Sequence, residues 1–233
     1  MTVYPPSAYK AAPPHEDDSL LIEMVRQLSA EVGVSSMAPN SLVWVALVPK
    51  DILDGSTRQA GSFTRIAPGD QARFVSQAIM LPSDLRGRLR PEEWRPIIAS
   101  SLIFRKTYWK LLLRKIALDW PSMFLTLVSL IGPFYFFFAI RSVWLAAIAT
   151  SVPITIFVVG QIGYNLAHKR LMLSADRQAA KLVGKQPFLD VLKKIDDFKL
   201  EDIEWIKGRG RIRRALTIDR PGIDERIRNL DSV

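Results

Sequence analysis

The sequence predicts an α+β membrane protein that is mainly helical, with a small β-sheet and a two-helix transmembrane hairpin. Residues 121–140 carry no charge, and after Arg141 residues 142–167 are uncharged again. Each run is long enough to cross about 30 Å of hydrocarbon. Short apolar runs rich in β-branched residues, between turn-forming segments, predict the sheet. We therefore expect a hairpin over residues 120–167.

The hairpin divides the rest of the chain into an interrupted domain. Residues 18–119 form its first part and residues 168–233 its second, after an extended Pro-rich tail at 1–17. Two buried helices of a soluble core are the alternative interpretation. Residues 134–140 are apolar on every helical face, however, which favours a membrane-spanning helix.

Basic residues flank the hairpin on both sides and predict its orientation. They are Arg105, Lys106, Lys110, Arg114 and Lys115 before it, and His168, Lys169 and Arg170 after it. The positive-inside rule places both termini on the cytoplasmic, matrix or stromal side. The expected location is a bacterial inner membrane or an organellar inner membrane. Other integral membrane proteins are the expected partners, packed against the hairpin 120–167.

Composition excludes several kinds of chemistry. The 233 residues include no cysteine and only two histidines, His15 and His168, so disulfides, thiolate chemistry and an imidazole-based zinc site are not expected. We expect no cofactor and no metal. The net charge of +9 favours anionic lipid headgroups, at about 1 kcal/mol per well-placed basic residue.

Local patterns predict the elements of the interrupted domain. An amphipathic helix begins near Asp18, after potential capping residues, and ends at Gly33. Strands are expected at Leu42 to Val48 and Arg73 to Leu81, with Phe63 to Ile66 as a candidate third strand. A further helix begins at Pro91, which is preset for the first helical position.

The C-terminal part is expected to be helical. Leu171 to Val183 forms a helix that ends at Gly184, Pro187 to Phe198 forms another, and a short helix follows Pro221. Residues 207–214 form a basic loop. Its residues Lys207, Arg209, Arg211, Arg213 and Arg214 are candidates for binding lipid headgroups or a partner, and the lack of interleaved aromatics argues against nucleic acid.

The order of these segments resembles the membrane-integrated HExxH zinc metallopeptidases of the heat-shock protease HtpX type. A helix that begins PEE, a membrane pair, a helix with an Ala-Asp pair and a closing ERI helix occur in that order. The resemblance covers roughly residues 18–233. It implies a metallopeptidase-like domain with the hairpin inserted between the two motif helices.

The resemblance also implies that the catalytic chemistry is lost. Ser100, Ser101 and Phe104 stand where the family has its first His, its catalytic Glu and its second His, so HExxH is replaced by Ser-Ser-Leu-Ile-Phe. Met172 stands at the position of the third ligand, while Asp176 is retained. Hydroxyl, phenyl and thioether groups do not form a zinc site of the expected kind.

These substitutions predict a catalytically inactive, membrane-anchored metallopeptidase homologue that acts as a structural or accessory subunit or scaffold in a larger membrane complex. The alternatives are a regulator of an active membrane protease, a membrane-surface binding module that uses residues 207–214, and an enzyme of another chemistry built on Ser100, Ser101 and Asp176. We further expect Phe104 to contact Met172 in the former metal cavity, and Ser100 to bond the carbonyl of Pro96 or Ile97.

Overall fold

The computed structural model describes residues 16–35, 38–45, 68–75, 77–109, 113, 141–210 and 220–232 of the 233. The chain divides into two compact units. The first comprises Met1–Lys106, Met172–Arg209 and Pro221–Val233, and the second comprises Thr107–Leu171 and Gly210–Arg220. The sheet, the main core and the candidate site all belong to the first unit.

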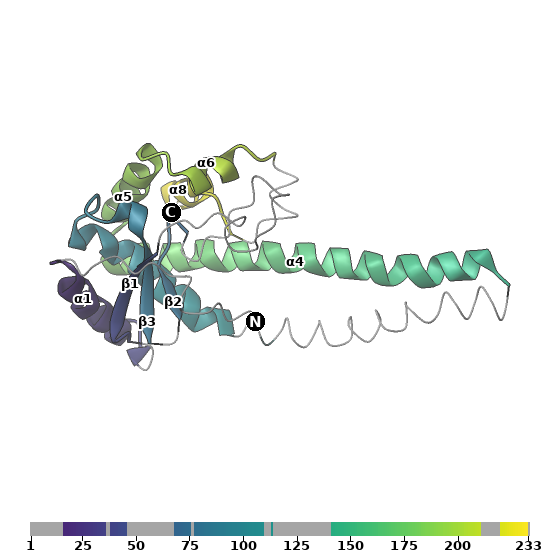
Figure 1. Ribbon diagram of the computed structural model, residues 1–233, viewed down its shortest axis with the longest axis horizontal. Helices are drawn as coiled ribbons and strands as arrows, with labels where there is room; N and C mark the ends of the chain where they lie inside the picture. Colours follow the sequence, from purple (N-terminus) through teal and green to yellow (C-terminus); the bar gives the residue numbers. More distant parts are fainter. Residues whose placement is uncertain are drawn as a thin grey trace, which may run out of the picture. The chain divides into compact units, whose positions relative to one another are not determined.

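A three-stranded mixed sheet forms the centre of the first unit (Figure 1). Its strands are β1 (Ser41–Val45), β2 (Arg73–Val75) and β3 (Ala78–Pro82), in the order β1-β3-β2. Strand β3 runs parallel to β1 and antiparallel to β2. Because β3 is central, its residues 79–82 are all buried.

The predicted strands are partly confirmed. The first is present as β1, whereas the segment predicted as one strand from Arg73 to Leu81 is two strands, β2 and β3, that reverse direction. The polar pair at residues 76–77 interrupts the apolar run, and this signal of a turn was missed. The candidate strand at 63–66 and the residues of the tail up to 15 lie outside the described residues.

Two helices pack with the sheet in the main core. The predicted helix near Asp18 is α1 (Asp18–Glu31), which buries Leu21, Val25 and Leu28 and is followed by Gly33 at a φ of 73°. The N-cap residue, Asp17, forms no side-chain cap hydrogen bond. In the first turn, the Asp18 carboxylate accepts a hydrogen bond from Trp44 Nε1 on β1 at 2.8 Å.

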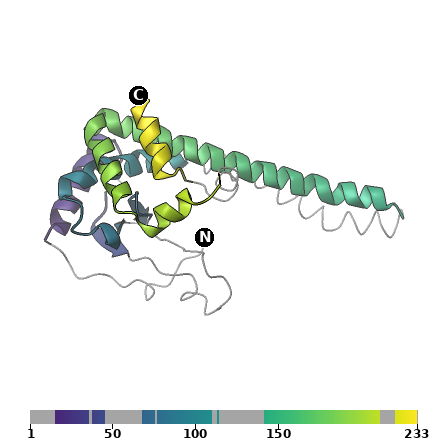
Figure 2. The ribbon, with the colours of Figure 1, turned by 90° about the horizontal axis from the view of Figure 1, so that it is seen from above.

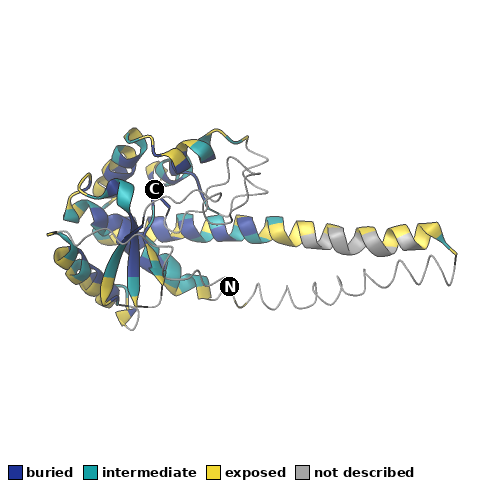
Figure 3. Ribbon diagram, viewed as in Figure 1, coloured by how far each residue is buried: buried dark blue, intermediate teal, exposed yellow. Residues whose placement is uncertain are grey.

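The second helix covers residues 91–109, and most of its residues from 94 to 103 are buried (Figure 3). Its core-facing side chains include Trp94, Ile97, Ile98 and Leu102, each no more than 1% exposed. Before its first turn, the Arg90 N–H donates to Glu93 Oε2 at 2.7 Å. This contact satisfies one of the backbone donors that a helix N-terminus leaves unpaired.

The C-terminal helices are α4 (Val143–Val183), α5 (Lys185–Asp197), α6 (Glu201–Lys207) and α8 (Ile223–Asp231). The predicted helix up to Val183 is the last part of α4, and Gly184, at a φ of 96°, separates it from α5. The sequence did not predict α6. Helices α5 and α8 lie side by side in the first unit (Figure 2).

The predicted transmembrane hairpin is wrong. Among the described residues, no helix has both the length and the apolar character that crossing a membrane requires. The integral-membrane location and the topology derived from it are corrected accordingly. The prediction relied on the absence of charge and on the apolar faces of residues 134–140, although the second run also carries hydroxyl and amide side chains, including Gln161, which donates to Asn165 at 3.2 Å. The first run, residues 121–140, lies outside the described residues.

Candidate functional site

An ion pair between Asp176 and Arg226 lies at the centre of the candidate site. Arg226, on α8, donates from Nε to Asp176 Oδ2 at 2.9 Å and from Nη2 to Asp176 Oδ1 at 2.8 Å. The guanidinium and the carboxylate therefore meet through two parallel hydrogen bonds, the strongest geometry for this pair. Asp176 is 1% exposed and Arg226 is 2% exposed.

The remaining Arg226 nitrogen binds a second acidic residue. Arg226 Nη1 donates to the backbone carbonyl of Asp70 at 2.5 Å and to its side-chain oxygen Oδ2 at 3.1 Å. The ring of Phe188, on α5, lies 5.7 Å from the guanidinium carbon. All three guanidinium nitrogens of Arg226 thus have acceptors, as a buried charge requires.

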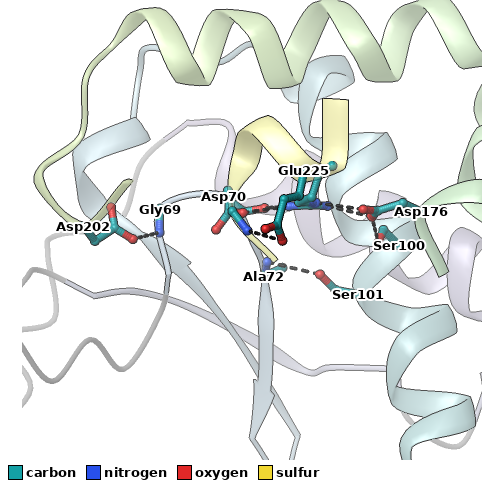
Figure 4. A network of polar contacts seen from close by, with 10 residues as sticks. Gly69, Asp70, Ala72, Ser100, Ser101, Asp176, Asp202 and Glu225 are labelled. Carbon is teal, nitrogen blue, oxygen red and sulfur yellow. Dashed lines mark hydrogen bonds and ion pairs between the residues drawn. The ribbon is translucent and has the colours of Figure 1, made fainter. Parts of the chain in front are cut away.

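Ser100 joins this network from the 91–109 helix. Its hydroxyl donates to Asp176 Oδ1 at 2.5 Å, and Figure 4 shows the two side chains pointing toward each other. The predicted bond from Ser100 to the carbonyl of Pro96 or Ile97 is therefore wrong. A carboxylate is a stronger acceptor than a carbonyl oxygen, and a hydroxyl has a single proton to donate.

Two further side chains hold the segment that contains Asp70. The N–H of Gly69 donates to Asp202 Oδ2, on α6, at 3.0 Å, and the N–H of Ala72 donates to Ser101 Oγ at 3.2 Å (Figure 4). Residues 69–72 are thus bound by side chains from α6, α8 and the 91–109 helix. The segment leads directly into β2, so these contacts also fix the start of that strand.

The environment keeps Arg226 charged. Burial by itself lowers the pKa of Arg226, but the ion pairs with Asp176 and then Asp70 outweigh it and raise the pKa above its usual value. Both oxygens of the Asp176 carboxylate accept hydrogen bonds from the guanidinium, and Oδ1 also accepts the Ser100 hydroxyl, so the carboxylate is fully engaged in contacts within the network.

The residues predicted for a former zinc site are only partly brought together. Ser100 and Asp176 bond each other, and Ser101 bonds Ala72. Phe104 is partly buried against the main core, whereas Met172 is 7% exposed and is not a member of that core. Their contact stays a prediction. Within the described residues, no three His, Cys, Asp or Glu side chains are grouped so that they could hold a metal ion.

Lys207, the first residue of the basic segment, is the last residue of α6, and its binding role stays a prediction. Lys207 forms ion pairs with Asp196 and, at 3.1 Å, with Glu204. Burial lowers its pKa, but the hydrogen bonds to these two acids outweigh it and raise the pKa of Lys207. The guanidinium carbon of Arg209 lies 3.6 Å from the ring centroid of Trp205. Arg211, Arg213 and Arg214 lie outside the described residues.

Sequence reasoning missed three residues of the site: Arg226, Asp70 and Asp202. A signal for Arg226 was present, because this charge lies three residues after Ile223 and four before Leu230, on the buried side of α8. A charge at a buried helical position requires a partner. Asp70 gave no such signal, because it lies outside any periodic element.

The fold and the site define a mainly helical α+β domain with a closed, buried network of charges. Comparisons with protein-family models, with curated proteins and with solved structures find nothing that matches the chain.

Proposed function

We propose that this chain is a catalytically inactive relative of the HExxH metallopeptidases that serves as an accessory or scaffold subunit of a protein complex. The observation that carries the proposal is the contact of Ser100 and Asp176 with each other and with Arg226. Ser100 stands where a peptidase of this type has its first zinc-binding His, and it donates to Asp176, which Arg226 also binds. These contacts support a structural role for the network rather than a catalytic one.

A serine-based hydrolase is the main competing proposal. It would need the Ser100 hydroxyl next to a base and accessible to substrate. Ser100 is 5% exposed, and the carboxylate it contacts is paired with a guanidinium. Ser101 accepts a hydrogen bond from the backbone N–H of Ala72. The geometry supports a structural role for both hydroxyls.

Large exposed apolar side chains on α4 support the binding part of the proposal. Trp144 is 82% exposed, Val143 63% and Val159 62%. Extended exposed apolar surface on a protein commonly marks a site of interaction with another protein. We therefore propose that a partner protein covers the part of α4 that belongs to the second unit.

Affinity purification after mild cross-linking, followed by quantitative mass spectrometry, tests this function. We expect a stoichiometric set of partners with the wild-type chain, loss of that set in Trp144→Ser/Val159→Ser, and its retention in the control Arg177→Ser, which changes an exposed α4 residue of the first unit. An active protease in the set would assign a regulatory role. Recovery of the chain alone, together with hydrolysis of a peptide substrate that Ser100→Ala abolishes, would contradict the proposal.

A further inference from the structure

Arg105 is a partly buried arginine of the first unit, and its surroundings differ from those of the fully buried Arg226. It lies on the 91–109 helix, and its Nη1 is buried without a hydrogen-bond partner in the part of the chain that the structure describes. Burial lowers the pKa of Arg105, and no carboxylate among the described residues offsets this effect. Arg226, by contrast, has two carboxylates as partners.

The position of Arg105 follows from the register between the helix and the sheet. Ser101 and Arg105 are four residues apart and lie on the same face of the helix. Ala72 and Phe74 are two residues apart and lie on the same side of the extended chain. Ser101 bonds Ala72, and the Arg105 guanidinium carbon lies 5.5 Å from the Phe74 ring. Two successive turns of the helix thus contact alternate residues of the extended chain, Ala72 just before β2 and Phe74 within it.

This packing holds the Arg105 guanidinium in a position that favours binding of an anion. The aromatic ring lies beside the guanidinium and restricts its motion, which reduces the entropy lost when a ligand binds. An unpaired, partly desolvated cation destabilises the fold, so a ligand that supplies the missing acceptor gains affinity. Neighbouring Lys106 is directed elsewhere, because its Nζ donates to the carbonyl of Val32 at 2.7 Å.

We propose that Arg105 anchors a binding site for a carboxylate group, which an acidic side chain or the chain terminus of a partner protein supplies. The proposal rests on the binding function proposed above, and it names the chemistry of the contact. A carboxylate carries one negative charge and matches the planar fork of a single guanidinium. Phosphate carries more negative charge than a carboxylate, and several cations bind it better than a single guanidinium does. Arg73, the nearest basic residue along β2, alternates to the opposite face from Phe74.

Nuclear magnetic resonance with acetate as the probe tests this site in the full chain. Sodium acetate is titrated against sodium chloride at equal ionic strength, and the backbone amide of Phe74 is followed, since it is present in every variant. We expect a saturable shift with acetate, a smaller response to inorganic phosphate, and binding weakened about tenfold or more in Arg105→Met and measurably in Arg105→Lys. The control Arg177→Met, at an exposed position on α4, should bind acetate as the wild type does.

Thermal unfolding adds a readout that a structural arginine would not give. Arg105→Met should unfold at the same temperature as the wild type or a higher one, because it removes an unpaired charge, and the acetate-dependent rise in Tm should disappear. Equal shifts with acetate and chloride, tighter binding of phosphate, or unchanged acetate binding in Arg105→Met would each overturn the carboxylate site. Those results would leave the set of captured partners unaffected. Conversely, peptidase activity would overturn the proposed function while acetate binding stayed as measured.

Discussion

Replacing Arg226 by Met should destabilise the first unit strongly. The substitution keeps a long unbranched side chain beside Phe188 but removes four hydrogen bonds, two to Asp176 and two to Asp70. In this variant, Asp176 would keep the hydrogen bond from the Ser100 hydroxyl. Its side chain is 1% exposed in the wild-type structure. A buried carboxylate that loses its counter-charge cannot recover its hydration without opening the core.

The expected loss is about 3–5 kcal/mol of unfolding free energy, the range for breaking a buried ion pair by removing one partner. Arg228→Met is a matched control on the same helix. Arg228 pairs with Asp224 at 3.0 Å, but its side chain is 70% exposed. An exposed helical pair of this spacing contributes about 0.3–0.5 kcal/mol. The two variants should therefore differ by roughly tenfold in their free-energy cost.

Urea unfolding, followed by circular dichroism, measures the unfolding free energy of both variants. The slope of that free energy against urea concentration shows whether the denatured state has changed. The double variant Arg226→Met/Asp176→Asn should lose at least about 1 kcal/mol less than the sum of the single variants, because the residues share one network. If Arg226→Met costs no more than Arg228→Met, the buried network does not stabilise the fold, and the reasoning is refuted.

Three further predictions concern other contacts. Burial raises the pKa of Glu93, but hydrogen bonds and charges, above all the hydrogen bond from Lys194, outweigh burial and lower the pKa below its ordinary value of 4.5. Glu93→Gln should therefore destabilise the fold near neutral pH. The difference in stability from the wild type should fade as the pH drops through the folded-state pKa. A constant difference down to acid pH would contradict this. Ser101→Ala should cost about 1–3 kcal/mol in urea unfolding because it leaves the Ala72 N–H without its acceptor, and a cost no larger than that of an exposed Ser→Ala change would argue against the contact. Gly184→Ala should cost about 1–2 kcal/mol because its φ is 96°, whereas the control Gly163→Ala, inside α4, should stabilise by about 0.5–1 kcal/mol; equal effects would be inconsistent with the backbone argument.

The sequence predicted elements whose signal is local. The apolar spacing of Leu21, Val25 and Leu28 gave α1, and Gly184 marked the end of α4, because glycine adopts a positive φ without strain. The turn at Gln77 was missed, because the apolar residues on either side read as one strand. The hairpin was wrong because long uncharged runs and apolar helical faces were taken as sufficient for spanning a membrane.

The site could be predicted only in part, because its contacts join residues far apart in the chain. Ser100 and Asp176 were singled out, but their mutual bond depends on packing between two helices. Arg226 was detectable as a charge on the buried face of α8. Its second partner, Asp70, is 156 positions away in a loop, where no periodicity indicates a neighbour. Pairing between residues so far apart in the chain can be recognised only in the folded structure.

Metal content tests the central claim most directly. The purified full chain is incubated with excess zinc, dialysed and measured by elemental analysis, beside Asp176→Asn and Ser100→Ala. The account predicts zinc well below one equivalent per chain and no dependence on either substitution, because Asp176 is bound by Arg226 and Ser100. Stoichiometric zinc in the wild type that is lost in Asp176→Asn would contradict it.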